Sequence, residues 1–209
     1  VMWLIDAATS AWPLWLAAAG WLINLYWVTR YPAAGQQWQA ISRRLAMGLW
    51  VLLPCWVGFN VLRESGMTWL LFVLLLVWCA DIGAYFVGRN WGKRKLAPRV
   101  SPGKSWEGVY GGLAATAILA VVFAVWLSLG MASSLTLILV TAVVTLTSVL
   151  GDLLESMLKR HRNIKDSSQL LPGHGGVMDR IDSLTAAIPL FALFYLEVLM
   201  PMLVQGQSL

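Results

Sequence analysis

Six long apolar stretches dominate the sequence and constrain its fold more than any other feature. Crossing the hydrocarbon core of a bilayer as a helix takes ~20 mostly apolar residues, and these stretches reach or approach that length. Inside lipid, the backbone can satisfy its hydrogen bonds only in helices or in a closed barrel. The stretches lack the alternation of barrel strands and are about twice too long for them. The sequence therefore predicts an all-α, polytopic integral membrane helical bundle. The predicted spans are residues 11–29, 45–62, 68–87, 107–128, 134–154 and 183–203.

The composition agrees with a membrane protein, and the sequence has no polar stretch of the kind that a second, soluble domain would need. Hydrophobic residues make up 59% of the chain and charged residues 12%, against about 45–50% and roughly 25% in soluble domains. The 13 tryptophans suit a protein with two membrane–water interfaces. We expect a single transmembrane domain over residues 1–209. The first apolar run has neither a basic flank nor a cleavage site, so it does not read as a signal peptide. Because the chain begins with Val1 and not with methionine, we expect upstream residues to precede it.

The basic residues predict the orientation of the bundle. Of the 15 Lys and Arg residues, all but Arg63 fall in the loops after the first, third and fifth predicted spans. The positive-inside rule places these three loops in the cytoplasm. The net charge of +5 is therefore a signal of topology and of attraction to anionic lipid headgroups. It does not indicate binding to nucleic acid.

Asp81 lies where the third span approaches the cytoplasm, and acids beside spans are usually functional. Asp81, Tyr85 and Gly88 are spaced i, i+4, i+7 and should share one helix face. The small residues around them would let another helix or a ligand approach closely. The alternative is that Asp81 only pairs with a basic residue of the loop.

The segment from Ser101 to Glu107 reads as a turn followed by a helix start. Ser105 is the predicted N-cap, and Glu107 falls in the first turn. Such a helix N-terminus beside Lys104 could bind an anion such as phosphate, although the spacing does not match a Walker A loop. A plain capped connection explains the pattern equally well.

A polar stripe closes the fifth span. Asp152, Glu155 and Ser156 fall at i, i+3, i+4 on an otherwise apolar helix. One interpretation is a plain ion pair with the basic run that follows at residues 159–162. The other is that paired acids facing the bundle interior hold a hard divalent cation such as Mg²⁺, which takes oxygen ligands.

The passage from Lys165 to Asp182 concentrates charge and glycine between two spans. Pro172, Gly173, Gly175 and Gly176 allow a tight turn and a close backbone approach. His174 lies within this turn. Asp179 and Asp182 should share a helix face, with Arg180 between them. Two acids beside a basic residue suit a metal-bridged polyphosphate; a solvated loop with ion pairs would leave the glycines unexplained.

The segment from Ser156 to Asp182 resembles the signature of the phosphatidate cytidylyltransferase family. The matching positions are Ser156-Met-Leu-Lys159-Arg160, then Lys165-Asp166, then the run from Leu170 to Asp182. The upstream stretch from Asp81 to Gly108 resembles a second part of the same family, except that Gly103 stands where the family often has lysine. The resemblance implies a dimeric, all-helical enzyme of the bacterial inner membrane with its active site facing the cytoplasm. Members of the family usually carry further N-terminal spans, so the resemblance also implies that such spans precede Val1. Such enzymes make CDP-diacylglycerol and pyrophosphate from CTP and phosphatidic acid. They require Mg²⁺, with K⁺ as a second cation.

The resemblance also implies roles for particular residues. We expect Asp152, Asp179 and Asp182 to surround Mg²⁺, with Asp81 supporting them or binding the second cation. Catalytic roles are expected for Asp152, Lys165, Asp179 and Arg180. The expected substrate contacts come from Ser101, Lys104, Lys159, Arg160, His174, Gly175 and Gly176.

Two other functions compete with this prediction. One is a different CTP-using membrane enzyme, such as a polyprenol or phytol kinase, against which the Lys165–Asp182 pattern argues. The other is a transporter, but transporter sites lie near the middle of the membrane, whereas these acids cluster at the ends of spans.

Overall fold

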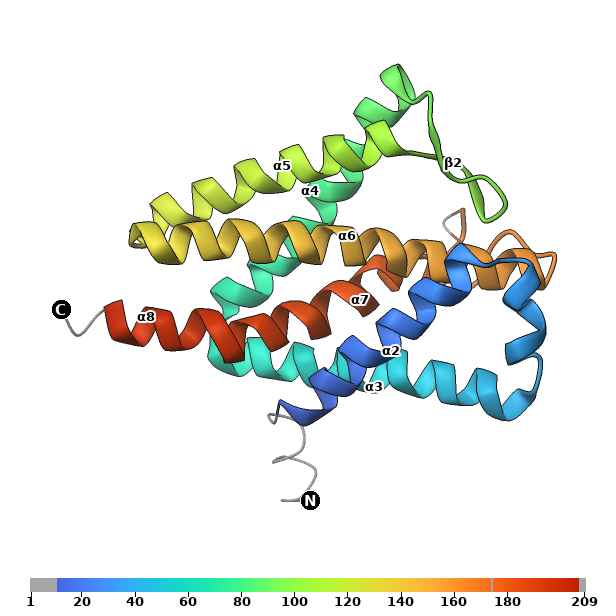
Figure 1. Ribbon diagram of the computed structural model, residues 1–209, viewed down its shortest axis with the longest axis horizontal. Coiled ribbons are helices and arrows are strands. Elements are labelled where there is room, and N and C mark those ends of the chain that lie inside the picture. The colour runs from blue at the N-terminus through green and yellow to red at the C-terminus, as the bar shows by residue number, and fades with distance from the viewer. Residues whose placement is uncertain (1–10, 174, 207–209) are drawn as a thin grey trace.

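The computed structural model describes residues 11–173 and 175–206, and in this part of the chain the fold is a bundle of helices (Figure 1). The helices run mostly along the long axis of the molecule. Their bounds are α2 (Trp12–Thr29), α3 (Ile41–Ser65), α4 (Met67–Trp91), α5 (Trp106–Trp126), α6 (Met131–His161), α7 (Met178–Phe194) and α8 (Met200–Gly206). A short 3-10 helix η1 (Ala33–Trp38) and a π-helical segment η2 (Tyr195–Leu199) complete the helical structure, and two strands, β1 (Lys95–Ala97) and β2 (Ser101–Ser105), pair beside α5. The predicted all-α membrane fold is confirmed.

Five of these helices are long and apolar enough to cross a membrane. They are Ile41–Ser65, Met67–Trp91, Trp106–Trp126, Met131–His161 and the continuous stretch Met178–Gln205. The first predicted span also forms a helix, α2, of 18 residues, but α2 is not one of the five. Helix α2 contains four tryptophans, and its Asn24 is buried.

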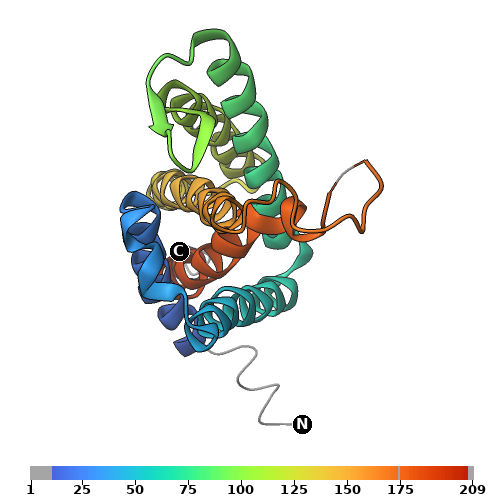
Figure 2. The same ribbon diagram turned by 90° about the vertical axis from the view of Figure 1, so that its right-hand side faces the viewer.

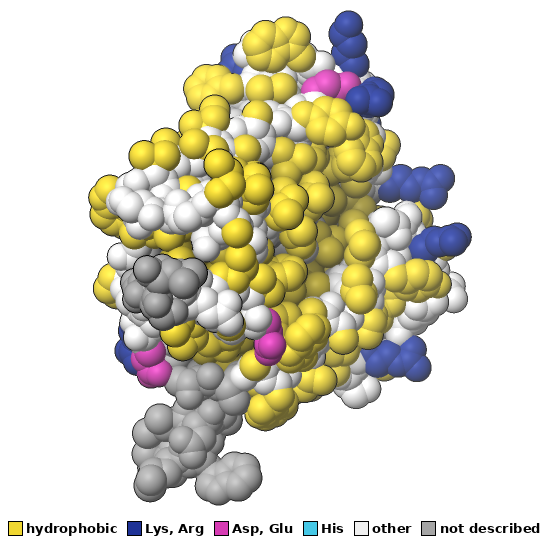
Figure 3. Space-filling model, turned by 60° about the vertical axis from the view of Figure 1, so that its left-hand side comes forward, with side chains coloured by type: hydrophobic (Ala, Val, Ile, Leu, Met, Phe, Trp, Pro, Cys, Tyr) yellow, Lys and Arg dark blue, Asp and Glu magenta, His cyan; other side chains and the backbone are white. Residues whose placement is uncertain are grey.

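The surface agrees with this assignment. Hydrophobic side chains cover most of the face seen in Figure 3, and most of the visible Lys and Arg side chains gather along its right-hand margin.

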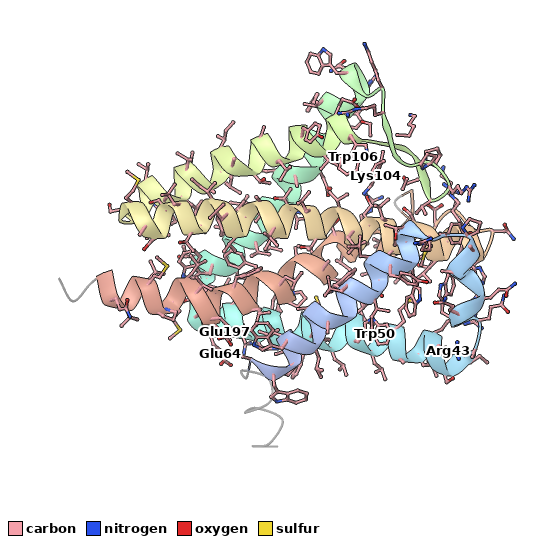
Figure 4. All side chains as sticks on the ribbon, viewed as in Figure 1. Arg43, Trp50, Glu64, Lys104, Trp106 and Glu197 are labelled. Carbon is pink, nitrogen blue, oxygen red and sulfur yellow. The ribbon has the colours of Figure 1, made fainter. Side chains whose placement is uncertain are left out.

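The helix directions bring the three basic connections together. The α2–α3, α4–α5 and α6–α7 connections all lie at one end of the bundle, which we call the basic end. Arg43 and Lys104 lie toward this end, whereas Glu64 and Glu197 lie toward the opposite one (Figure 4). The alternation of basic loops predicted from the sequence is therefore present in the fold.

Small residues determine how α4 and α5 pack. A Cβ added at Gly111 would fall 2.5 Å from the Cβ of Val87 and 2.7 Å from the carbonyl oxygen of Gly83. No side chain fits there, so the two backbones can approach closely, as in many helix pairs of membrane proteins. The prediction that the small residues around Asp81 admit another helix is confirmed, and that helix is α5.

The β-hairpin between α4 and α5 was not predicted. Strand β1 pairs antiparallel with β2, with Lys95 opposite Ser105 and Ala97 opposite Ser101. The carboxylate of Glu107 fixes the base of the hairpin, accepting hydrogen bonds from the backbone amides of Lys93 and Arg94, each at 3.1 Å. The predicted N-cap is confirmed, because the Ser105 hydroxyl accepts a bond from the Gly108 amide at 3.2 Å.

Helix α6 is the longest element and extends well past the predicted span. It continues to His161, whose ring lies 4.4 Å from that of the buried Trp38 of η1. Helix α7 also begins earlier than predicted, at Met178. Seen from the basic end, the hairpin and the α6–α7 loop lie on opposite sides of α6 (Figure 2).

Candidate active site

A cavity of about 450 Å³ lies between α4, the hairpin, the start of α5 and α6. We call it the polar cavity because charged side chains are part of its lining. Helix α4 contributes Asp81, Tyr85 and Gly88 to its lining. The prediction that these three residues share one face is therefore confirmed. Lys104 enters from β2 and Asp152 from α6.

Lys104 and Asp152 form an ion pair across this cavity. The Lys104 Nζ lies 2.6 Å from the Asp152 Oδ2, and the Ser156 hydroxyl donates to the Asp152 Oδ1 at 3.1 Å. Asp152 thus pairs with the hairpin and not with the basic run after it. Asp81 lies close enough to interact electrostatically with both Lys104 and Asp152. Three charged groups from three different elements meet at one place.

A second charged cluster lies one turn further along α6. The Lys159 Nζ lies 2.6 Å from the Glu155 Oε2 and 2.6 Å from the Asp179 Oδ1. The side chains are largely buried, with exposed fractions of 18% for Lys159, 6% for Glu155 and 9% for Asp179. Breaking a buried pair of this kind leaves an uncompensated charge, which is strongly destabilising. The cluster therefore ties α6 to the start of α7.

Asp179 also anchors the glycine-rich loop. Its Oδ2 accepts hydrogen bonds from the Ser167 amide at 2.9 Å, the Ser167 hydroxyl at 2.6 Å and the Gly176 amide at 2.7 Å. A Cβ at Gly176 would fall 2.1 Å from the Ser167 Oγ, so a glycine is required there. The sequence predicted a close backbone approach at the glycines. In the structure, the backbone of the glycine-rich loop approaches the carboxylate of Asp179, which anchors this loop.

Asp182 lies on the next turn of α7 and faces α6. It is close enough to interact with Asp152 and Glu155, and its Oδ1 accepts a bond from the Ser183 amide at 2.7 Å. Asp152 therefore interacts electrostatically with both Asp81 and Asp182. It links the polar cavity to the cluster around Lys159.

The donor set is compatible with a magnesium ion bound together with a polyphosphate. In residues 11–173 and 175–206, no three His, Cys, Asp or Glu side chains come close enough to hold a metal on their own. Mg²⁺, however, is usually bound by one or two carboxylates plus substrate phosphates and water. The buried Oε1 of Glu155, near Asp182, has no hydrogen-bond partner within the described structure. Such an oxygen is costly to leave unpaired, and a cation nearby would compensate it.

The remaining predicted residues lie around these two clusters. Ser101 is half-buried in β2, and the Arg160 Nε donates to the carbonyl of Val100 at 3.4 Å. Lys165 is exposed in the α6–α7 loop, Arg180 is exposed on the first turn of α7, and Gly175 is half-buried with a φ of +79°. His174 lies outside the described residues.

Two residues of the candidate site, Arg89 and Ser167, were not singled out from the sequence. Arg89 lines the polar cavity and donates to the Tyr85 hydroxyl at 2.6 Å; the i, i+4 spacing from Tyr85 was the available signal. Ser167 anchors the loop to Asp179. The chain had no local signal for that contact, since the two residues are twelve positions apart.

The fold and the site define a multi-pass membrane protein with clustered acidic and basic side chains at the basic end of its helices. The chain belongs to the cytidylyltransferase family, whose match covers residues 1–198. The resemblance seen in the Ser156–Asp182 segment is thereby confirmed.

Individual bacterial relatives agree with the family. The chain is 52% identical over 183 residues to the phosphatidate cytidylyltransferase of Pseudomonas aeruginosa, covering 86% of this chain and 67% of that protein. It is 47% identical over 195 residues to the Haemophilus influenzae phosphatidate cytidylyltransferase, covering 88% and 68%. For the Bacillus subtilis enzyme of the same name the identity is 43% over 137 residues, covering 64% and 51%. The chain thus spans between half and about two thirds of the length of these relatives.

Proposed function

We propose that this protein transfers the cytidylyl group of CTP to phosphatidic acid, giving CDP-diacylglycerol and pyrophosphate. The observation that carries the proposal is the alternation of acids and bases on α6, where Asp152 pairs with Lys104 and Lys159 pairs with Glu155 and Asp179. The names of the relatives support the same reaction. A lipid kinase or a transporter has no such support.

The reaction joins two polyanions and needs little covalent help from the protein. An oxygen of the phosphatidate phosphate attacks the α-phosphorus of CTP, and the bond from that phosphorus to the bridging oxygen breaks. Pyrophosphate leaves with the electron pair. A phosphate monoester is largely ionised near neutral pH, with a second pKa of about 6, so a strong general base is unnecessary. The barrier lies in positioning the reactants and neutralising their charge.

The basic side chains would hold the anions. Lys104 lies in the polar cavity on a hairpin fixed by Glu107, so its ammonium is held in place before substrate arrives. We assign it, with Arg89 of the same cavity, to the CTP phosphates or to the phosphatidate headgroup. Lys165 and Arg180, exposed beside the loop, would meet the outer phosphate oxygens, and Ser101, Arg160 and His174 would complete the polar contacts.

The carboxylates would hold magnesium. We assign Asp152 and Asp182 to the ion, with Asp81 in support or at a second cation such as K⁺. Asp179 would contribute through its Oδ1, which accepts a hydrogen bond from Lys159. When bound, Mg²⁺ supplies neutralisation of phosphate charge. Glu155 keeps Lys159 in place beside Asp179.

The setting of the reaction is also a proposal. We place the basic end in the cytoplasm of a bacterial inner membrane, where CTP is available, and we propose a homodimer. Phosphatidic acid would reach the site from the cytoplasmic leaflet, with its headgroup entering between helices.

Position-specific labelling of CTP tests the reaction. Purified protein is incubated with phosphatidic acid, Mg²⁺ and CTP labelled with ³²P at either the α or the γ position. We expect the α label in the lipid product and the γ label in pyrophosphate. A γ label in the lipid would indicate a kinase. If neither labelled form of CTP gives a labelled lipid, the proposal is refuted.

A further inference from the structure

An apolar cavity of about 590 Å³ lies beneath the hairpin, separate from the polar cavity. Its walls come from the C-terminal part of α2, the start of α5 and the middle of α6, and residues 96–100 of the hairpin region cover it. The α6 wall includes the apolar residues Leu146, Leu150 and Leu153. The polar side chains in the lining include Thr29 and Arg99, both exposed. The volume lies within the range of roughly 300–1,000 Å³ that is typical of small-molecule sites.

The two cavities are neighbours. Val109 of α5 and Val149 of α6 line both of them. The same hairpin covers both, with residues 96–100 over the apolar cavity and residues 103–105 over the polar one. A molecule with an anionic head and an apolar tail could therefore lie across the two valines, with its head beside Lys104 and its tail in the apolar cavity.

The position of the cavity fits a lipid in particular. Leu25 of α2 and Leu146 of α6 line the cavity and are both exposed. Helix α6 is long and apolar enough to cross a membrane, so an exposed leucine on it can face hydrocarbon. Trp106, the first residue of α5, lies near Lys104 of β2 at the basic end (Figure 4), and tryptophan favours the membrane–water interface. Arg99 of the hairpin region is exposed and lines the cavity, and an exposed cation near a membrane surface attracts anionic lipid. The cavity thus combines mostly apolar walls with an exposed cation in its lining.

We propose that this cavity holds an acyl chain of the phosphatidate substrate and selects for chain length. The inference rests on the proposed function, because it assigns the lipid substrate of that reaction to a particular place. The phosphate of the lipid lies in the polar cavity beside Lys104, the glycerol crosses Val109 and Val149, and one chain runs between α2 and α6.

Filling the cavity tests the proposal. Leu146→Trp places a larger ring at its α6 wall, and Leu53→Trp on α3 is the matched control. Both leucines are similarly exposed, at 48% and 55%, but Leu53 lines a different apolar groove between α2 and α3. Activity is measured with dipalmitoyl and with dihexanoyl phosphatidate, at saturating CTP.

We expect Leu146→Trp to raise the KM for the dipalmitoyl lipid by about tenfold, the equivalent of losing burial of roughly two methylene groups. The KM values for the dihexanoyl lipid and for CTP should stay near those of the unmodified protein, and Leu53→Trp should change none of them. An unchanged KM for the long-chain lipid would overturn the proposal. So would an equal loss with both lipids, which indicates general damage, or a change of oligomeric state, which indicates a protein interface.

Photocrosslinking provides a second, independent measurement. A phosphatidate analogue with a diazirine near the end of one acyl chain is irradiated with the unmodified protein, and labelled peptides are mapped. Labels on α2 near Leu25 and on α6 between Leu146 and Leu153, removed by excess dioleoyl phosphatidate, are expected. Labels confined to the α2–α3 groove around Leu53 would overturn the proposal. If the unmodified protein transfers the α label of CTP to lipid while these results fail, only the chain site is wrong; if it transfers none, the proposed function fails first.

Discussion

Lys104 and Asp152 are 48 positions apart in the chain, yet the Lys104 Nζ lies 2.6 Å from the Asp152 Oδ2. The pair joins the hairpin to α6 at the wall of the polar cavity. In the absence of substrate, each group neutralises the other at the place where we propose that a nucleotide and a metal ion bind. On binding, a substrate phosphate would pair with Lys104 and Mg²⁺ would bind Asp152. These two stronger interactions would replace the Lys104–Asp152 pair.

Lys104→Ala should lower kcat/KM for CTP by about 10²-fold, because it removes a fixed cation aimed at developing phosphate charge. The matched control is Lys93→Ala, which removes an exposed lysine just before the same hairpin and should change the rate little. Steady-state kinetics with varied CTP measure both. Equal rates for Lys104→Ala and the unmodified protein would exclude Lys104 from phosphate binding.

Lys159→Met should destabilise the protein by about 3–5 kcal/mol, because it leaves Glu155 and Asp179 as neighbouring buried carboxylates without a counter-charge. Adding Glu155→Gln to this variant should restore part of the stability. Arg63→Met breaks an exposed pair with Glu64 and should cost less than about 1 kcal/mol. Unfolding in detergent measures all three variants, and a Lys159→Met protein as stable as Arg63→Met would contradict the burial argument.

Asp179→Asn should lower kcat by about 10²–10³-fold, since an amide group cannot accept all the hydrogen bonds that Asp179 accepts and carries no charge for Lys159. Membrane insertion should be unaffected. Limited proteolysis should also cut the α6–α7 loop faster, because its anchor is weakened. Glu64→Gln neutralises an acid at the opposite end and serves as control. A near-normal turnover number in Asp179→Asn would remove this residue from the site.

Gly176→Ala should lower kcat by up to about 10²-fold, because a displacement near 1 Å is enough to misalign reacting groups. The added Cβ would lie 2.1 Å from the Ser167 Oγ, so the loop must shift. Gly130→Ala, before α6, meets no atom within 4 Å and should be neutral. If both substitutions are neutral, the loop conformation does not matter for turnover.

Removing Mg²⁺ with a chelator should abolish product formation, and added Mg²⁺ should restore it. Asp182→Asn should raise the Mg²⁺ concentration for half-maximal activity by about tenfold or more, the range found when groups around a metal are altered. Titrations of activity against free Mg²⁺ check this. An unchanged half-saturation point would show that Asp182 does not contribute to metal binding.

Helix periodicity explains what could be predicted from the sequence. Asp81, Tyr85 and Gly88 share a face because any α-helix places i, i+4 and i+7 together, and their common cavity followed from that spacing. The Ser105 cap was also predictable, because capping depends only on residues that are close in the sequence. Five of the six predicted spans, and the gathering of basic loops at one end, followed from hydropathy and charge; the first predicted span, now α2, is a helix but is not among the five membrane candidates.

Contacts between distant segments account for what was missed. Nothing near Lys104 in the sequence indicates that its partner is Asp152 and not a residue of the basic run that follows α6. The hairpin was missed because β2 contains Pro102 and Gly103, residues that are depleted in strands; its pairing is fixed by Glu107 from the next helix. The role of Asp179 as a loop anchor depends on Ser167, whose position is set only by the folded loop.

Helix α6 contributes residues to both charged clusters and is one continuous helix. Asp152 and Lys159 are seven residues apart, which corresponds to about 10 Å along the axis and almost two full turns. Both side chains therefore keep a common orientation whatever the surrounding loops do. A single residue inserted between them would rotate the downstream half by about 100°, so that Lys104 and Asp179 could no longer both reach their partners. We therefore expect insertions to be tolerated in the connections around this segment but not between Asp152 and Lys159.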